Sequence, residues 1–126
     1  MPKSVIETPK APAPIGPYNQ AIESGNMLFV SGQIAIDPES GDMLTQDIVT
    51  ETHQVMKNIG AILEEAGTGY GNIVKCSIFV KNMDDFAVIN EAYGQYFNDN
   101  APARETVEVS RLPKDVNVEI SCIAVI

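Results

Sequence analysis

The chain has 126 residues, of which 44% are hydrophobic and 20% charged, and its formal net charge is −9. This size and balance fit one globular domain, residues 1–126, with a core that needs no disulfide or metal to hold it together. An acidic chain without a lysine and arginine cluster is poorly suited to nucleic acid or to anionic membranes, and the simplest role for its charge is solubility.

The N-terminal stretch MPKSVIETPKAPAPIGPY has no apolar core of the kind that defines a secretory signal. No segment approaches the roughly 18 apolar residues of a membrane span. Cys76 and Cys122 each fall inside a predicted strand, without the spacing of a disulfide framework or a metal site. We therefore expect a soluble, cytoplasmic protein with no metal ligand set and no membrane partner.

The first predicted elements are extended. Residues 7–17 hold four of the eight prolines, which excludes a helix there. Strands are predicted over residues 18–23 and 27–36, with a turn at Gly25. Gly32 interrupts the second strand, which indicates a bulge or a close backbone approach.

A helix is predicted over residues 47–66, where one face repeats in steps of three and four and Gly67 marks the end. A strand over residues 72–80 and a second helix over residues 84–97 follow. The inner stripe of that second helix consists of Phe86, Ile89, Tyr93 and Phe97.

The chain closes with a predicted hairpin, residues 106–111 and 116–126, which turns near Pro113. The order of elements predicts a two-layer α+β domain: a mixed sheet of about six strands with two helices on one face.

Alternation within the strands predicts the two faces of the sheet. Under the helices we expect Val74, Cys76, Ile78 and Val80, and from the last strand Val118, Ile120, Cys122 and Ala124. The opposite face is half apolar and includes Ile73, Phe79, Asn117, Glu119, Ser121, Ile123 and Val125. Since no helix remains to cover it, this face predicts contact with another subunit.

Few residues carry chemistry. His53 is a lone histidine at the edge of the first helix, too isolated for a zinc site. Arg104 precedes a strand and suits bidentate capture of a carboxylate, or else is solvated or pairs within the chain. Glu119 lies in an apolar strand, where burial would raise its pKa and let it activate a water, or else it pairs with a neighbouring subunit.

Four colinear stretches carry a resemblance that covers nearly the whole chain: IGPYNQA, LFVSGQI, NIVKCSIFVKNMDDFAVINEAY and PARETVEVSRLPKDVNVEISCIAV. They resemble the reactive-intermediate deaminase family, RidA or YjgF. The resemblance implies a chorismate-mutase-like subunit and a homotrimer with sheets facing its centre and active sites between subunits. It implies no cofactor.

The activity that the resemblance implies is hydrolysis of a C=N bond. Substrates would be 2-iminobutanoate, 2-iminopropanoate and their enamine tautomers, released by pyridoxal-phosphate enzymes such as threonine dehydratase, and the products would be 2-oxo acids and ammonia. Two further functions stay open: a regulatory trimer that binds 2-oxo acids without turnover, and an endoribonuclease or translation inhibitor.

By position, the resemblance makes Arg104 the carboxylate anchor and Glu119 the residue that holds the attacking water. The same comparison places further residues around the substrate: Tyr18, Ser31, Gly32, Asn90 and Thr106.

Three features depart from the family pattern. Thr106 stands where many members have cysteine, and Glu105 where a small hydroxyl residue is common. The loop over residues 98–104 is short, with Ala101 where phenylalanine is frequent. These differences bear on pocket shape and on the preferred imine.

Overall fold

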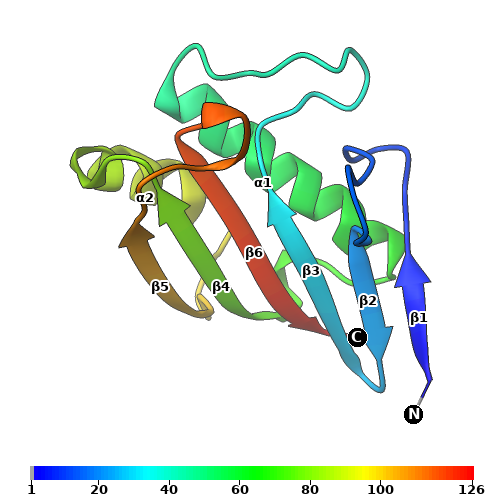
Figure 1. The fold of residues 1–126 in the computed structure, drawn as a ribbon. Coiled ribbons are helices and arrows are strands. Elements are labelled where there is room, and N and C mark those ends of the chain that lie inside the picture. Colours follow the sequence, from blue (N-terminus) through cyan, green and yellow to red (C-terminus); the bar gives the residue numbers. More distant parts are fainter. Residues whose placement is uncertain (1) are drawn as a thin grey trace.

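The structure is a computed structural model that describes residues 2–126 as one sheet with two helices on one face (Figure 1). The elements are β1 (Lys3–Ile6), β2 (Ala21–Ser24), β3 (Met27–Gln33), α1 (Ile48–Glu65), β4 (Ile73–Val80), α2 (Phe86–Gly94), β5 (Ala103–Glu108) and β6 (Val118–Val125), with short 3₁₀ turns at Tyr70–Asn72, Met83–Asp85 and Pro113–Asp115. The strand order is β1-β2-β3-β6-β4-β5, parallel only between β4 and β5. The predicted two-layer α+β fold with a mixed sheet is confirmed.

The first helix begins and ends where its sequence predicts. The Asp47 carboxylate accepts a hydrogen bond from the Thr50 amide at 2.8 Å, which caps the helix start. Gly67 follows the helix with φ of 80°, a conformation that glycine adopts without strain. The second helix is shorter than predicted because residues 83–85 form a 3₁₀ turn and the α-helix ends at Gly94.

Two irregularities in strand pairing decide which residues reach the core. Pairing of β3 with β6 shifts register between Val30 and Gln33, which confirms the predicted irregularity around Gly32. Pairing of β4 with β6 shifts between Ile73 and Lys75. The prediction that Val74 faces the helices and Ile73 faces away was therefore wrong: Ile73 is 4% exposed and Val74 43%. A bulge breaks the strict alternation on which that prediction depended.

The predicted closing hairpin is also wrong. β4 lies between β5 and β6 and pairs with both, in parallel with β5 and antiparallel with β6. The turn at Pro113–Asp115 reverses the chain, but the place of β5 is set by α2, which connects it to its parallel neighbour β4. Two smaller differences lie at the N-terminus, where β1 was not predicted and β2 begins at Ala21 rather than at residue 18.

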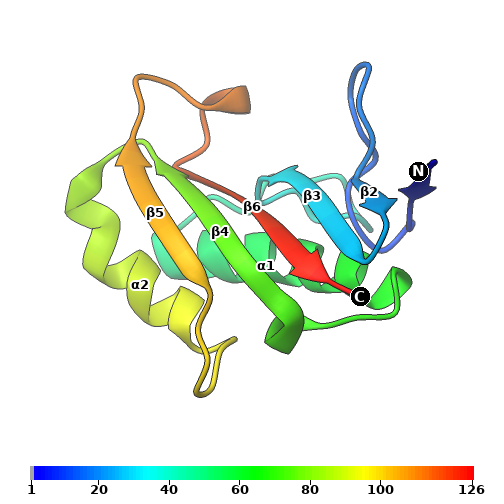
Figure 2. The same ribbon diagram turned by 90° about the horizontal axis from the view of Figure 1, so that it is seen from below.

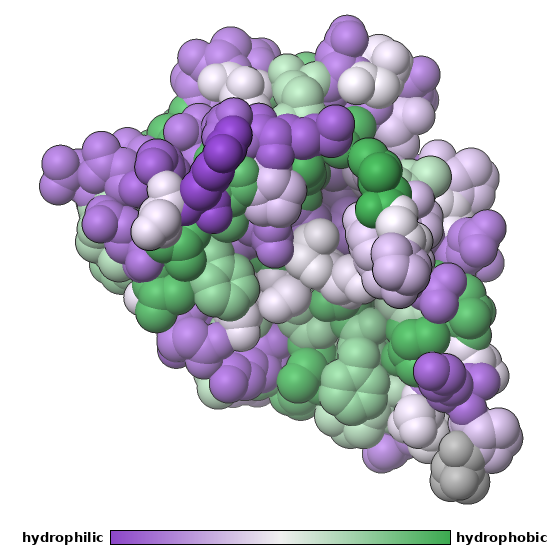
Figure 3. Space-filling view, in the orientation of Figure 1, coloured by the Kyte–Doolittle hydropathy of each residue, from purple (hydrophilic) through white to green (hydrophobic). Residues whose placement is uncertain are grey.

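The two faces of the sheet differ sharply. The helix-covered face is the core and contains, among others, Leu28, Val30, Cys76, Ile78, Val80, Val118, Ile120, Cys122 and Ala124. Among residues 2–126, no helix covers the other face, as Figures 1 and 2 show. Apolar side chains gather over the strands on it (Figure 3), and Phe29, paired in register with Ile123, is 46% exposed. We call this the open face.

Within residues 2–126, neither helix has the length and apolar character needed to span a bilayer.

Candidate functional site

Arg104 lies on the helix side of the edge strand β5. Its partner in the β4 register is Cys76, which is fully buried beneath the helices, so the arginine side chain lies against α2. Nη1 donates a 2.6 Å hydrogen bond to Asn90 Oδ1. The guanidinium carbon is 5.6 Å from the ring centre of Phe86 and 5.3 Å from that of Tyr93. Arg104 was predicted in a loop, but it lies within a strand that fixes its direction.

No carboxylate neutralises Arg104 within residues 2–126. The ion pairs in that range join Lys75 to Glu105 at 3.0 Å and Arg111 to Asp115 at 2.7 Å. The alternative in which Arg104 serves an intrachain salt bridge is therefore wrong. A guanidinium held by an amide and two rings, with donors left over, has the fixed fork that a carboxylate binds bidentately.

Thr106 and Glu105 point to opposite sides of β5. Thr106 pairs in register with the buried Ile78, and its hydroxyl oxygen is buried without a hydrogen-bond partner in residues 2–126. Glu105 pairs with Ser77 on the open face, where hydrogen bonds from Ser77 and Lys75 lower its pKa. The negative charge that Glu105 adds is thus directed away from Arg104.

Glu119 lies on the open face of the central strand β6. Its side chain is half-buried and makes no hydrogen bond with residues 2–126, and burial raises the pKa of its carboxyl above the ordinary value. Gly32 on β3 makes room for it, since a side-chain carbon added at Gly32 would lie 2.8 Å from the Glu119 carboxyl carbon. The group that lies close to Gly32 is thus the Glu119 side chain, whereas the sequence predicted a bulge or a close backbone approach.

Tyr18 and Ser31 lie near Gly32. The Ser31 hydroxyl donates a 2.6 Å hydrogen bond to the Asn19 carbonyl, which ties β3 to the segment that carries Tyr18. The Tyr18 side chain is 49% exposed, and its hydroxyl accepts a 3.3 Å hydrogen bond from the Ile15 amide. Tyr18 and Gly32 line one cavity of about 310 Å³.

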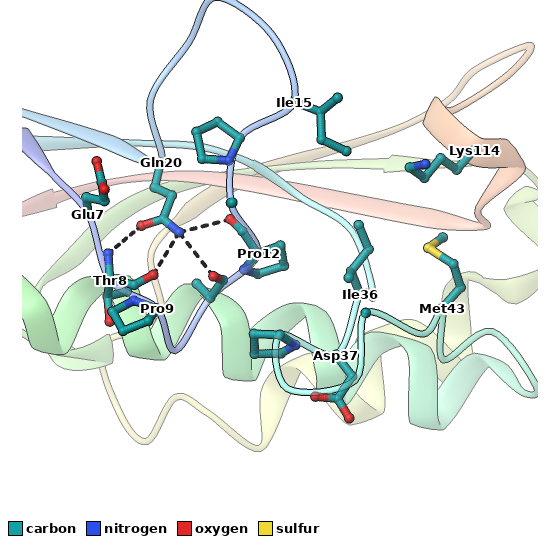
Figure 4. Close-up of a pocket in the computed structure, with 15 residues that line it drawn as sticks. Glu7, Thr8, Pro9, Pro12, Ile15, Gln20, Ile36, Asp37, Met43 and Lys114 are labelled. Carbon is teal, nitrogen blue, oxygen red and sulfur yellow. Dashed lines mark hydrogen bonds between the residues drawn. The ribbon is translucent and has the colours of Figure 1, made fainter.

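Gln20 lines the same cavity and was not among the residues predicted for the site. Its buried side chain accepts a 2.7 Å hydrogen bond from the Thr8 amide and donates to the carbonyls of Thr8, Ala11 and Pro12 at 2.9 to 3.2 Å. These bonds fasten the proline-rich segment to the start of β2 (Figure 4). The sequence signal for this role was the position of Gln20 next to the proline-rich segment. Because prolines there cannot pair in a sheet, the backbone groups of that segment need a side-chain partner such as glutamine.

The predicted residues thus form two groups on opposite faces of the sheet. We call Arg104, Asn90 and Thr106 the arginine half-site, and Tyr18, Ser31, Gly32 and Glu119 the glutamate half-site. Within one chain the sheet itself separates them, because the side chain of Arg104 is on the helix side and that of Glu119 is on the open face. A ligand on one face of a single chain therefore contacts only one of the two groups.

The histidine and the thiols take no part in either half-site. Residues 2–126 contain no group of three or more His, Cys, Asp or Glu that could hold a metal ion. The His53 Nδ1 atom lies 2.7 Å from the Tyr96 hydroxyl oxygen, within hydrogen-bonding distance. Cys76 and Cys122 are buried free thiols whose pKa values burial raises, which disfavours the reactive thiolate.

Comparison with known proteins decides the family. Residues 8–126 match the family model described as Endoribonuclease L-PSP. A RutC family protein of Pyrococcus abyssi is 55% identical over 98% of both chains. Reactive Intermediate Deaminase A of Arabidopsis thaliana, a chloroplastic protein, is 43% identical over 97% of this chain and 65% of its own length.

The chain belongs to the RidA/YjgF family. Among solved structures of this family, E. coli TdcF with bound serine is 42% identical and superposes with a TM-score of 0.94 over 98% of each chain. The RidA/YjgF fold is thus shared over essentially the whole molecule.

Proposed function

We propose that this protein hydrolyses 2-imino acids and their enamine tautomers to 2-oxo acids and ammonia, at sites formed between its copies. One observation carries the proposal: within residues 2–126, Arg104 is a positioned cation without an anion, and Glu119 is a half-buried carboxyl without a hydrogen-bond donor. The two lie on opposite faces of one sheet. A copy whose β5 edge packs against the open face of the next copy would bring Arg104 of the one beside Glu119 of the other.

The assembly that we propose is a homotrimer whose open faces turn toward its centre. Exposed apolar side chains on that face, including Phe29 at 46%, favour burial against another subunit. In this arrangement the arginine half-site of one copy meets the glutamate half-site of the next.

The proposed reaction needs positioning and a proton acceptor. Arg104 binds the substrate carboxylate in two-pronged fashion and places the imine carbon near Glu119 of the adjacent copy. The substrate reacts as the N-protonated imine: water adds its oxygen to that carbon, Glu119 takes the water's proton, and the C=N electron pair moves to nitrogen, which becomes a neutral amine. Glu119 then protonates the amine, the C–N bond breaks as ammonia leaves, and the hydroxyl proton passes to solvent as the 2-oxo acid forms.

The small number of catalytic groups fits such a substrate. An imine carbon is already electrophilic, so binding in an attack geometry and one acid–base group supply an adequate acceleration. No cofactor enters this scheme. The serine in the TdcF structure is a small molecule with a carboxylate, and the Arabidopsis relative is named a reactive intermediate deaminase; both agree with this substrate class.

The test is a coupled assay. A threonine dehydratase, a pyridoxal-phosphate enzyme, releases 2-iminobutanoate from threonine, and the lifetime of the imine is measured with and without the protein. Faster conversion to 2-oxobutanoate and ammonia supports the proposal. An unchanged lifetime together with binding of 2-oxobutanoate would indicate a regulatory binding protein instead.

The family model is described as an endoribonuclease, so cleavage of RNA is the second activity to test. The net charge of −9 opposes binding of an RNA backbone, and we expect no cleavage of single-stranded RNA at physiological salt. Cleavage that disappears with Arg104→Lys would favour that activity over imine hydrolysis.

A further inference from the structure

The cavity beside Tyr18 and Gly32 does not end there. A second cavity of about 620 Å³ lies under the proline-rich segment, and the two share several wall residues, among them Pro12, Ile15, Ile36 and Lys114. Figure 4 shows Ile15 and Lys114 on one rim, with Ile36 and Met43 across from them. We call the two adjoining spaces the arm cavity.

The part of the arm cavity that borders Gly32 has mainly apolar walls. Ile15, Ile34, Ile36 and Pro113 line it, and Lys114 is its one charged residue among residues 2–126. The Gln20 side chain also lines it, but its hydrogen-bonding atoms are bound to the backbone of the proline-rich segment. An alkyl group fits such walls, whereas a cationic group would meet the ammonium of Lys114.

Contacts within the chain position the walls of the arm cavity without a ligand. Gln20 holds one wall through the hydrogen bonds described above. On the other wall, Lys114 and the adjacent Asp115 adopt left-handed backbone angles, with φ of 55° and 56°. Arg111 forms an ion pair with Asp115 at 2.7 Å. A preformed cavity binds its ligand without first ordering its walls.

We infer that the arm cavity holds the side chain of the substrate, and that this protein favours 2-imino acids with apolar side chains longer than ethyl. The inference rests on the proposed function. Gly32 borders both the cavity and the Glu119 carboxyl, so a reacting carbon held near Glu119 has its side chain at the cavity mouth. An ethyl group leaves most of about 310 Å³ unfilled, while a butyl group extends toward Ile36.

The test compares equilibrium binding of 2-oxobutanoate and 2-oxohexanoate by titration calorimetry. Each added methylene should strengthen binding roughly fourfold, since burying one CH₂ contributes about 0.8 kcal/mol. The wild-type protein should therefore bind the six-carbon acid about fifteenfold more tightly than the four-carbon acid.

A bulky substitution in the cavity wall gives the matched comparison. Ala13 is exposed on the wall of both cavities, so Ala13→Phe should fill the space and remove the preference for the longer acid while 2-oxobutanoate still binds. Ala87→Phe makes the same change on the exposed surface of α2, outside both cavities, and should keep the preference.

The outcomes separate this inference from the proposed function. Equal affinities in the wild-type protein, or equal weakening of both acids by Ala13→Phe, would overturn the inference even if 2-iminobutanoate is hydrolysed. A chain-length preference that Ala13→Phe abolishes would support the cavity even if no imine is turned over.

Discussion

The two half-sites are built in different ways. The arginine half-site is held rigidly: Arg104 lies in a strand, bonds to Asn90 and sits over two aromatic rings. The glutamate half-site leaves its carboxyl unbonded and half-buried against the backbone of Gly32. Rigidity suits a group that orients a substrate, while an unbonded carboxyl with a raised pKa suits one that exchanges protons. In the proposed mechanism, one face of the sheet therefore binds the substrate and the other carries out the chemistry.

Glu119→Gln should have the largest effect on turnover. Removing a general acid–base group costs on the order of a hundredfold or more in kcat, while the amide still fits beside Gly32. We expect 2-oxo acid affinity, measured by calorimetry, to change little. Equal losses of affinity and rate would make Glu119 a structural residue.

Glu51→Gln is the matched control for that variant. Glu51 is fully buried and accepts hydrogen bonds from the backbone amides of Asn117 and Val118 at 2.7 and 3.1 Å. Weakening these charge-assisted bonds should lower the free energy of unfolding by about 1–3 kcal/mol. Turnover by the folded fraction should stay near the wild-type value, as urea unfolding and activity measured on one preparation will show.

Arg104→Lys should weaken the other half-site. Lysine keeps the charge but not the two-pronged geometry, so kcat/KM should fall roughly tenfold to a hundredfold, as expected for losing about 1.5–3 kcal/mol of charged hydrogen bonding. The circular dichroism spectrum and the oligomeric state should not change. A variant within twofold of wild type would show that Arg104 does not anchor the carboxylate.

The pH dependence tests the glutamate half-site. As a base, Glu119 must be ionised, so kcat/KM should fall as pH drops through its pKa, which burial raises above the ordinary 4.5. Stability should change in the opposite sense: the contribution of Glu119 is full below 4.5 and is lost as pH rises through the raised pKa. A rate profile that keeps the same acid limb in Glu119→Gln would assign that limb to another group.

Changes at Thr106 and at the thiols should have the smallest effects. In the proposed mechanism a water attacks the substrate, so the Thr106 hydroxyl has no covalent role and Thr106→Ala should retain activity within a few-fold. Cys76 and Cys122 are buried with raised pKa values, so iodoacetamide should leave activity intact. Stoichiometric inactivation with either cysteine modified would contradict both the burial and the mechanism.

Local patterns predicted much of this molecule, and long-range pairing limited the rest. The periodicity over residues 47–66, the alternation from Val118 to Ala124 and the irregularity at Gly32 all report on immediate neighbours, and the structure confirms them. The prediction of a closing hairpin was wrong because β5 pairs with β4, to which the helix α2 connects it, and not with β6, which follows the turn.

Prediction of the site was also limited because local motifs do not report long-range strand pairing. Motifs indicated Arg104 and Glu119 as functional residues, but only the register with Cys76 shows that Arg104 lies on the helix side. That the two residues lie on opposite faces therefore could not be predicted from the positions of motifs. The role of Gln20 was not predicted for a similar reason, since its hydrogen-bond partners lie 8 to 12 residues earlier in an irregular segment.

The most direct test of a site shared between copies is complementation. Arg104→Lys and Glu119→Gln proteins are unfolded together, refolded as a mixture, and assayed for imine hydrolysis against each parent. If one copy supplies Arg104 and the next supplies Glu119, the mixture should recover about a quarter of wild-type activity, because one interface in four pairs two intact half-sites in a random cyclic assembly. Activity no greater than the average of the two parents would contradict the shared site.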